Sequence, residues 1–385
     1  MAHHYGDYQL RIYQNGLRGD RPSLPMRLAD MERAARSVLP PESYWYVAGG
    51  AGETTMQANR DAFDRYRILP RMLGDVSERD LSVELFGHRY PSPLLLAPIG
   101  VQSIICEEAE VAVARAAAEL EVPMILSTVS AHSIETVAET MGDAPRWFQL
   151  YWPKSDALAA SFVSRAEAAG YQAIVVTLDT KMMAWRERDL QNAFLPFLKG
   201  QGLANYISDP VFLEGLEAPP EEDMWPSIRR WGHEFADPSK TWEDLAALRE
   251  ATRLPIILKG ILHPEDARLA IEHGVNGIIV SNHGGRQVDG SIASIDALPA
   301  VKAVVGDRMP VLFDSGIRSG SDVLKAKALG ADAVLLGRPY IWGLALAGTA
   351  GVREVIQRLL ADVDLSMALA GQSRFATIER DLLVD

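Results

Sequence analysis

The sequence predicts an α/β protein whose core is a (β/α)8 barrel, and two repeated patterns carry this prediction. In the first pattern, a helical stretch stops at a glycine and a run of β-branched and aliphatic residues begins three residues later. Glycine suits the left-handed residue that closes a helix, and such runs are typical of strands buried on both faces. The glycines are Gly170, Gly274 and Gly330. In the second pattern, a proline precedes a short apolar run, as at Pro93, Pro123, Pro255 and Pro310.

Together with the run WFQLYW at 147–152, the two patterns predict eight strands. These are 94–98, 124–128, 147–151, 173–179, 255–259, 277–281, 310–314 and 333–337. Helical periodicity separates most of them, most clearly at 108–120, 155–169, 264–273 and 319–329. Eight buried strands that alternate with helices pair in parallel, and closure into a barrel is their natural arrangement. An open, doubly wound sheet is the alternative.

The rest of the chain is expected to surround this barrel as part of one domain, 1–385. Residues 1–90 are predicted to form an N-terminal helical layer, with 38–53 as a loop over one end of the barrel. Residues 190–241, after the fourth strand, contain many aromatic residues without a clean period. This segment is too long for a simple connection, so we expect a lid over the active site.

Composition excludes several classes of partner. A net charge of −13 argues against nucleic acids and anionic membranes. No apolar run reaches the roughly 18 residues that a membrane-spanning helix needs, and the polar N-terminus lacks a secretory core, so a cytoplasmic protein is expected. Cys106 is the single cysteine and is expected to be a buried thiol. The acidic stretch at 219–223 has no histidine nearby, so no metal site is predicted.

Each predicted strand ends in polar or glycine-rich sequence. In a barrel of this type the chemistry lies at the carboxyl ends of the strands, so these residues are candidates for the site. In chain order they are Pro98, Gly100, Ser127, Thr128, Gln149, Tyr151, Thr177, Asp179, Lys259, Ser281, Asn282, His283, Asp314, Arg318, Gly337 and Arg338.

The loops after the seventh and eighth strands, DSGIRSGSD and GRP, are typical of a phosphate site. Glycines let backbone N–H groups approach a phosphate, and the helix that begins near Ser319 directs its positive end there. Arg318 and Arg338 can neutralise the charge. The alternative is that both arginines form surface ion pairs.

The segment SNHGGRQVDG at 281–290 is the most specific signal. His283 ends a buried strand, and Arg286 follows three residues later. An arginine fork can bind a substrate carboxylate, which would place the neighbouring proton beside the imidazole. Asp179 could orient that imidazole and stabilise its charged form. The alternative is a lone core histidine without a catalytic role.

Lys259 ends the fifth strand alone. Burial normally lowers the pKa of a lysine, so a retained charge implies an anionic partner, such as a reduced flavin ring. The alternative is an ion pair with Asp314 or Asp179.

These residues together resemble the FMN-dependent L-2-hydroxy acid oxidising family, of which SNHGGRQ is the signature. Extended matches to its lactate 2-monooxygenase branch include YGDYQLRIYQNGL (5–17), YVAGGAGE (46–53), RMLGDVSERDLSVELFG (71–87) and APIGV (97–101). The resemblance covers nearly the whole chain. It implies FMN as cofactor, a small 2-hydroxy acid and dioxygen as substrates, and a homotetramer or homo-octamer.

The resemblance also implies a role for each matching residue. His283 would be the base and Asp179 its partner, with Tyr46, Arg186 and Arg286 on the substrate carboxylate and Tyr151 on the hydroxyl oxygen. Lys259 would face the flavin pyrimidine edge, and Pro98 and Gly100 would also belong to the cofactor site. Ser127, Gln149, Thr177 and Ser281 would bond the ring and ribityl chain, and Asp314 the ribityl hydroxyls. Gly316, Arg318, Gly337 and Arg338 would seat the phosphate.

Two positions bear on the outcome of the reaction. The family's oxidases carry alanine where this chain has Gly100, whereas the monooxygenase carries glycine. Glycolate oxidase has tryptophan at the position of Val129, so the substrate pocket differs there. Gly100 and the long segment at 190–241 favour the monooxygenase outcome, oxidative decarboxylation of L-lactate to acetate, CO2 and water.

Several alternatives stay open from the sequence. The first is an oxidase that releases keto acid and hydrogen peroxide, and the second is a mandelate-type oxidase or dehydrogenase. A flavin-dependent isomerase and a non-catalytic barrel are more distant readings. The sequence also leaves open whether the electrons leave the substrate as a hydride or through a carbanion.

Overall fold

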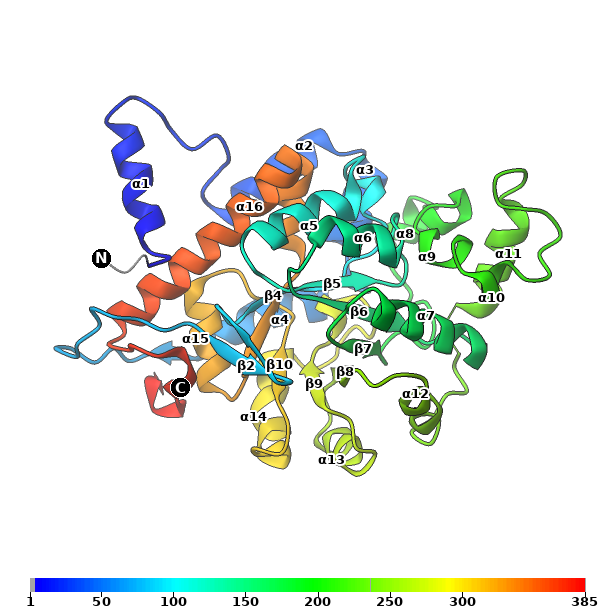
Figure 1. Ribbon diagram of the computed structural model, residues 1–385. Coiled ribbons are helices and arrows are strands. Elements are labelled where there is room, and N and C mark those ends of the chain that lie inside the picture. Colours follow the sequence, from blue (N-terminus) through cyan, green and yellow to red (C-terminus); the bar gives the residue numbers. More distant parts are fainter. Residues whose placement is uncertain (1–3, 236, 385) are drawn as a thin grey trace.

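The computed structural model describes residues 4–235 and 237–384, and its centre is a closed barrel of eight parallel strands (Figure 1). The strands pair in chain order, and the last pairs with the first. They are β4 (Leu94–Leu96), β5 (Met124–Ser127), β6 (Arg146–Tyr151), β7 (Ile174–Thr177), β8 (Ile256–Ile261), β9 (Gly277–Val280), β10 (Val311–Phe313) and β11 (Ala333–Leu336). Every predicted strand is present, with its ends within two residues of the predicted ones, so the (β/α)8 barrel is confirmed and the open sheet is excluded.

Helices surround the barrel and connect successive strands (Figure 1). They are α5 (Ala109–Glu119), α6 (Ile134–Met141), α7 (Asp156–Ala168), α12 (Leu245–Ala251), α13 (Pro264–Glu272), α14 (Ser294–Val305), α15 (Gly320–Ala328) and α16 (Arg338–Leu369). Local sequence sets their ends. The Ser155 side chain accepts the N–H of Leu158 to cap the start of α7, and Gly170, at φ +73°, follows its end.

The N-terminal region contains the predicted helical layer: α1 (Asp7–Gly16), α2 (Leu28–Val38), α3 (Pro41–Ala48) and α4 (Thr54–Asp61). The loop expected at 38–53 is wrong over half of its length, because α3 occupies 41–48. Pro41 stands in the first turn of α3, where a missing N–H costs nothing. The helix α1 projects from the body and contacts α16 (Figure 1).

The end of this region is a hairpin rather than a helix. The strands β2 (Val83–Leu85) and β3 (His88–Tyr90) pair antiparallel around Phe86 and Gly87, with alternating burial in β2. Phe86 lies against Gly277, the first residue of β9, and against Trp147 near the start of β6. The hairpin therefore lies at the amino end of the barrel. A short antiparallel pair of β1 (Arg67–Ile68) and β12 (Leu383–Val384) joins the segment after α4 to the C-terminal segment.

The excursion, residues 190–241, forms short helices beside the barrel mouth (Figure 1). These are the end of α8 (Glu187–Gln191), then α9 (Ala204–Ile207), α10 (Pro210–Leu213) and α11 (Trp225–Glu234). Aromatic rings form its core: Phe197 stacks on Trp231 at 4.4 Å, and Trp231 lies 5.0 Å from Phe235. The buried amide of Asn205 donates to Thr128 O at 3.0 Å and accepts from Ile134 N, which ties the excursion to the end of β5.

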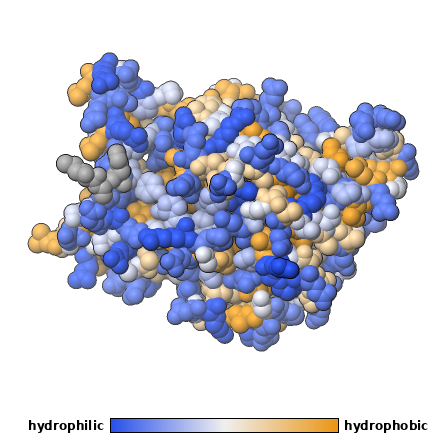
Figure 2. All heavy atoms as spheres, in the orientation of Figure 1, coloured by the Kyte–Doolittle hydropathy of each residue, from blue (hydrophilic) through white to orange (hydrophobic). Residues whose placement is uncertain are grey.

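The visible surface is mostly hydrophilic, with scattered apolar side chains that are denser over the excursion at the right (Figure 2). Leu198 and Trp225 are among the exposed residues of that segment. Within the described residues, no helix is both long enough and apolar enough to cross a bilayer.

Candidate active site

A cavity of about 1160 Å³, its open mouth included, lies at the carboxyl ends of the strands. Most predicted site residues line it directly: Tyr46, Pro98, Gly100, Tyr151, Arg186, Lys259, His283, Arg286, Asp314, Gly316, Arg318, Gly337 and Arg338. Five others lie just behind its wall: Ser127, Gln149, Thr177, Asp179 and Ser281. The residues that the sequence assigns to one site therefore meet at one end of the barrel.

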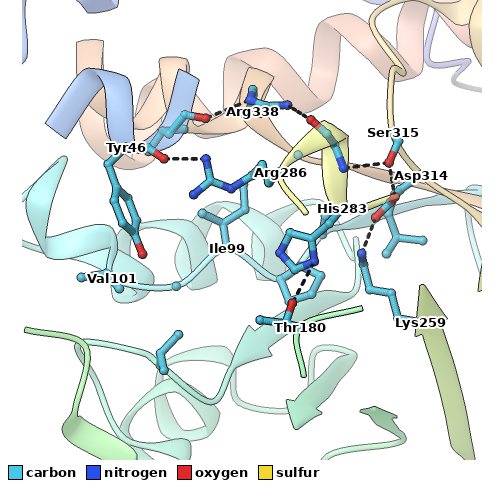
Figure 3. Close-up of a pocket in the computed structure, with 18 of the residues that line it drawn as sticks. Tyr46, Ile99, Val101, Thr180, Lys259, His283, Arg286, Asp314, Ser315 and Arg338 are labelled. Atoms are coloured by element: carbon cyan, nitrogen blue, oxygen red, sulfur yellow. Dashed lines mark hydrogen bonds and ion pairs between the residues drawn. The ribbon is translucent and has the colours of Figure 1, made fainter. Parts of the chain in front are cut away.

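His283 follows β9 in a left-handed conformation, with φ +59°. A non-glycine residue in that region is uncommon, and here its backbone N–H donates to Ser281 Oγ at 3.0 Å. Its Nδ1 lies 2.8 Å from Asp179 Oδ1, and Thr180 Oγ1 lies 3.5 Å from the same nitrogen. Figure 3 shows the imidazole facing the cavity. His283 lines the cavity, so it is not a residue of the core, and the pairing occupies Nδ1 rather than Nε2.

The electrostatics of this pair favour a neutral imidazole beside an ionised carboxylate. Burial lowers the pKa of His283, and Lys259 and Arg186 lower it too. Asp179 only partly offsets them, so the pKa lies below its usual value. Burial raises the pKa of Asp179, but the interaction with His283, the charge of Lys259 and the Thr180 hydrogen bond together outweigh it, so that pKa is lowered overall. A neutral imidazole is the form that can accept a proton.

Two arginines stand over the cavity. Arg286 donates from Nη1 to the carbonyls of Tyr46 at 2.6 Å and Gly49 at 2.9 Å. Arg186 donates from Nε to Arg286 O at 3.1 Å and from Nη2 to Gln287 Oε1 at 2.8 Å. Burial and the nearby Arg186 lower the pKa of Arg286 to about 10, while Asp189 opposes the shift. Asp189 lies 3.9 Å from Arg186, and a further anion, such as a carboxylate, would stabilise the two close cations.

Two tyrosines complete this side of the cavity. Tyr46 comes from α3, and the guanidinium carbon of Arg286 lies 5.4 Å from its ring centre. Tyr151 ends β6 and packs edge-on against Phe235 at 5.3 Å. Burial raises the pKa of both hydroxyls, so both are hydrogen-bond donors at neutral pH.

A chain of buried polar side chains lies beneath the cavity. Ser127 Oγ donates to Gln149 Oε1 at 2.9 Å, and Gln149 Nε2 donates to Thr177 Oγ1 at 3.0 Å. Barrel pairing sets this order, because Ser127 lies opposite Gln149. These two hydrogen bonds fix the orientation of the Gln149 amide, and therefore which of its atoms can face a bound ligand.

Lys259 forms the ion pair that the sequence left as an alternative. Its Nζ lies 3.0 Å from Asp314 Oδ2 and donates to Ser281 Oγ at 2.7 Å. Ser315 Oγ also donates to Asp314, at 2.8 Å. Lys259 and Asp314 still line the cavity, so the pair presents a cation and a carboxylate to a ligand.

The predicted phosphate cradle closes the other side. Gly316 has φ +118°, and a Cβ there would lie 2.8 Å from Asn59 O, so glycine is required. Ser319 and Asp322 form a capping box at the start of α15. Arg338 donates to Val47 O at 2.8 Å, Gly49 O at 2.9 Å and Gly284 O at 3.0 Å (Figure 3).

Arg318 and Arg338 are partly buried in this cradle, and neither makes an ion pair within the described part of the chain. The alternative of surface ion pairs is therefore wrong. Burial and neighbouring cations lower the pKa of Arg318 to about 10 and that of Arg338 to about 9, while Glu32 opposes both shifts. These values are above neutral, so both groups are charged.

Several contributors were missed by the sequence reasoning. Thr180 directly follows Asp179 in the sequence, and Gln287 directly follows Arg286. This adjacency could have indicated both residues. Gln287 Nε2 donates to Asp179 O at 2.5 Å, which joins the base to the arginines. Arg60 bonds Gly316 O and Asp322 Oδ2 from α4, a position that no local pattern indicates.

These residues fit a phosphate-bearing flavin. The cradle contains the guanidinium groups of Arg318 and Arg338 and the N-terminus of α15. Gly316 lies among them, where a side chain would collide with the backbone. The Ser127–Gln149–Thr177 chain and Lys259 supply donors and acceptors for a planar heterocycle. The space between them and His283 accommodates a ring next to a small acid.

Comparison with known proteins agrees with this geometry. The family model described as FMN-dependent dehydrogenase matches residues 35–385. An L-lactate oxidase of Lysinibacillus sphaericus (strain C3-41) is 47% identical over 361 residues, 94% of this chain and 93% of that protein. A 4-hydroxymandelate oxidase of Amycolatopsis orientalis is 44% identical and spans 89% and 94%. A crystal structure of mandelate oxidase superposes with a TM-score of 0.83 at 42% identity, covering 94% and 98%. The chain therefore belongs to the FMN-dependent dehydrogenase family and is an FMN-dependent 2-hydroxy acid oxidoreductase.

Proposed function

We propose that this enzyme oxidises a small L-2-hydroxy acid, L-lactate first, with dioxygen as the final electron acceptor. The observation that carries the proposal is the convergence of the His283–Asp179 pair with Arg286 and Tyr151 on one cavity. A relative named L-lactate oxidase, 47% identical over most of both chains, supports the choice of substrate.

Binding comes first. The substrate carboxylate would lie between Arg286 and Arg186, whose charges it neutralises. Within the described residues, Nη1 of Arg286 donates to the carbonyls of Tyr46 and Gly49, so Nε and Nη2 can bind the acid. The hydroxyls of Tyr46 and Tyr151 would hold the carboxylate and the substrate hydroxyl oxygen.

Chemistry then needs a base. His283 would accept a proton from the substrate at Nε2, and Asp179 would stabilise the imidazolium that forms. FMN, when bound, supplies a two-electron acceptor that dioxygen can reoxidise. Lys259, close to Asp314 and Ser281, would place positive charge beside that acceptor.

Gly100 supports a monooxygenase outcome. A Cβ at this position would lie 2.5 Å from Val129 O, so the wall here accepts glycine alone without a shift. In this outcome, lactate and dioxygen give acetate, CO2 and water, because the keto acid is retained and decarboxylated. The excursion at 190–241 would serve as the lid that delays product release.

The second candidate is an oxidase that releases pyruvate and hydrogen peroxide. The relatives named L-lactate oxidase and 4-hydroxymandelate oxidase favour it. An aromatic substrate is favoured by the similarity to mandelate oxidase. The apolar wall of the cavity, Val129, Leu195, Phe197 and Phe235, would receive either substrate side chain.

The deciding experiment measures oxygen consumed against peroxide and CO2 released, with L-lactate and mandelate in parallel. A monooxygenase yields one CO2 and no peroxide per oxygen, whereas an oxidase yields one peroxide and no CO2. A protein without oxygen uptake, or a colourless one, would contradict the proposal. Light scattering on the same sample would test the proposed homotetramer or homo-octamer.

A further inference from the structure

Glu110 is a fully buried carboxyl group that the proposed reaction does not use. It lies in the first turn of α5 with no exposed surface. Its Oε1 accepts the backbone N–H of Gln102 at 3.1 Å, and its Oε2 accepts that of Ala131 at 3.1 Å. The Ser130 hydroxyl is a further partner. One side chain thus joins two segments that follow different strands.

Those two segments form one wall of the cavity. Gly100 and Val101 follow β4, Val129 follows β5, and all three line the cavity. They touch each other directly: Val101 N donates to Val129 O at 2.8 Å, and Val101 has φ +56°. Because Gly100 already lies against Val129 O, a small displacement of either segment changes the shape of the wall.

The ionised form of Glu110 suits this position. A carboxylate only accepts hydrogen bonds, so each oxygen can hold one loop, whereas a protonated carboxyl loses an acceptor site. Burial raises the pKa of Glu110 to about 7, and the hydrogen bonds from Gln102, Ala131 and Ser130 oppose that rise. Tyr340 of α16 is the titratable neighbour. Burial and Glu110 raise its pKa well above 10, so it is neutral in this range.

We propose that Glu110 is a positioning residue that clamps the segments after β4 and β5 and so sets the wall formed by Gly100, Val101 and Val129. The inference rests on the proposed function only in assigning that wall to the face of the flavin. The clamp itself is a property of the protein without cofactor.

The test compares Glu110→Gln with Glu108→Gln. Gln has the shape of Glu but offers one acceptor oxygen, so it can hold one loop. Glu108 stands in the same region, half-exposed and paired with Arg115, and serves as the matched control. Amide hydrogen exchange is measured at Gln102 and Ala131 in cofactor-free protein, followed by FMN affinity and the rate of flavin reduction.

We expect Glu110→Gln to exchange at least one of these amides about tenfold faster or more and to reduce its flavin about tenfold more slowly, with KM changed less than threefold. Glu108→Gln should match the parent in every measurement. Unchanged exchange would overturn the clamp. Faster exchange with an unchanged reduction rate would reduce Glu110 to a structural role and overturn the positioning claim.

A measurement on the parent protein covers the case in which Glu110→Gln does not fold. Protection of the Gln102 and Ala131 amides, corrected for intrinsic exchange, should fall as the pH drops below about 7, because the carboxylate becomes protonated. Protection that stays constant from pH 8 down to pH 4, where the carboxylate is protonated, would overturn the proposal. These exchange results do not depend on which acid is oxidised, so failure of the proposed function is distinguishable from failure of the clamp.

Discussion

The two ends of the barrel differ in what they bury. At the amino end, Trp147 Nε1 donates to Tyr90 Oη at 3.2 Å, and Tyr90 donates to Gln172 at 2.9 Å under the β2–β3 hairpin. At the carboxyl end, Arg286, Arg318 and Arg338 are partly buried cations whose pKa values burial lowers. At the amino end, Tyr90, Trp147 and Gln172 are hydrogen-bond partners of one another. At the carboxyl end, positive charge gathers where a bound anion would stabilise it.

Backbone strain does not separate the two ends. Phe86 in the hairpin turn has φ +53°, and His283 at the opposite end has φ +59°. Phe86 directs an aromatic ring against Trp147, whereas His283 directs an imidazole into the cavity. A strained backbone conformation indicates a functional site only where it directs a reactive or charged side chain into a cavity.

The largest effect is expected from His283→Gln. Without an imidazole to accept the proton, flavin reduction by L-lactate should slow about 1000-fold, within the range that general base catalysis supplies. FMN should stay bound, which its absorption spectrum checks. The control is His88→Gln in the hairpin, which should reduce its flavin at the parent rate. Rapid flavin reduction in His283→Gln would show that His283 is not the base.

A smaller effect is expected from Arg286→Lys. A lysine is a point charge that cannot bind a carboxylate with two parallel hydrogen bonds, so kcat/KM should fall roughly 100-fold. Arg146→Lys is the matched change near the other end, where Arg146 donates to the carbonyls of Gly142 and Ala169. It should lower thermal stability and leave kcat/KM within about twofold. Equal kinetic losses in both variants would contradict the difference between the ends.

The pH dependence should identify the His283–Asp179 pair. Only neutral imidazole accepts a proton, so kcat/KM should fall as the pH drops through the His283 pKa, which burial holds below 6.5. Asp179 raises that pKa, so in Asp179→Asn the acid limb should move to lower pH, with a plateau about 100-fold lower. Steady-state rates between pH 4.5 and 8 check both. A shift of the acid limb to higher pH would show that a group other than His283 titrates there.

The smallest effect on catalysis is expected from Phe86→Ala. Removing the ring that packs on Trp147 should destabilise the fold by about 2 kcal/mol, less than the loss of a fully buried aromatic ring, because Phe86 is only partly buried. The acid limb and the KM for L-lactate should not change. Urea unfolding and steady-state kinetics on the same sample separate the two quantities. A large change in KM would show that the two ends are coupled through the barrel.

Sequence reasoning succeeded where local patterns fix the structure. The eight strands carried apolar runs after prolines or helix-ending glycines, and their polar ends therefore marked the site. It failed at 38–53, where Pro40, Pro41 and the paired glycines resemble a loop, although Pro41 is favoured in the first turn of α3. The short helices of the excursion have too few turns to show a period.

The site shows the same division. Residues at strand ends, such as His283 and Arg318, were predictable because barrel topology brings them together. Arg60 was not, since it reaches the cradle from a helix outside the repeat. The Lys259–Asp314 ion pair was named only as an alternative, because sequence does not decide which of several nearby carboxylates a buried cation meets.

The contacts of Arg338 have a consequence for how the enzyme matures during synthesis. This residue belongs to the last barrel strand's loop, yet its guanidinium is held by the carbonyls of Val47 and Gly49 near the start of the chain. A ribosome must release almost all of the polypeptide before both halves of that contact exist. Nascent chains should consequently lack a finished pocket, and cofactor capture should follow translation rather than accompany it.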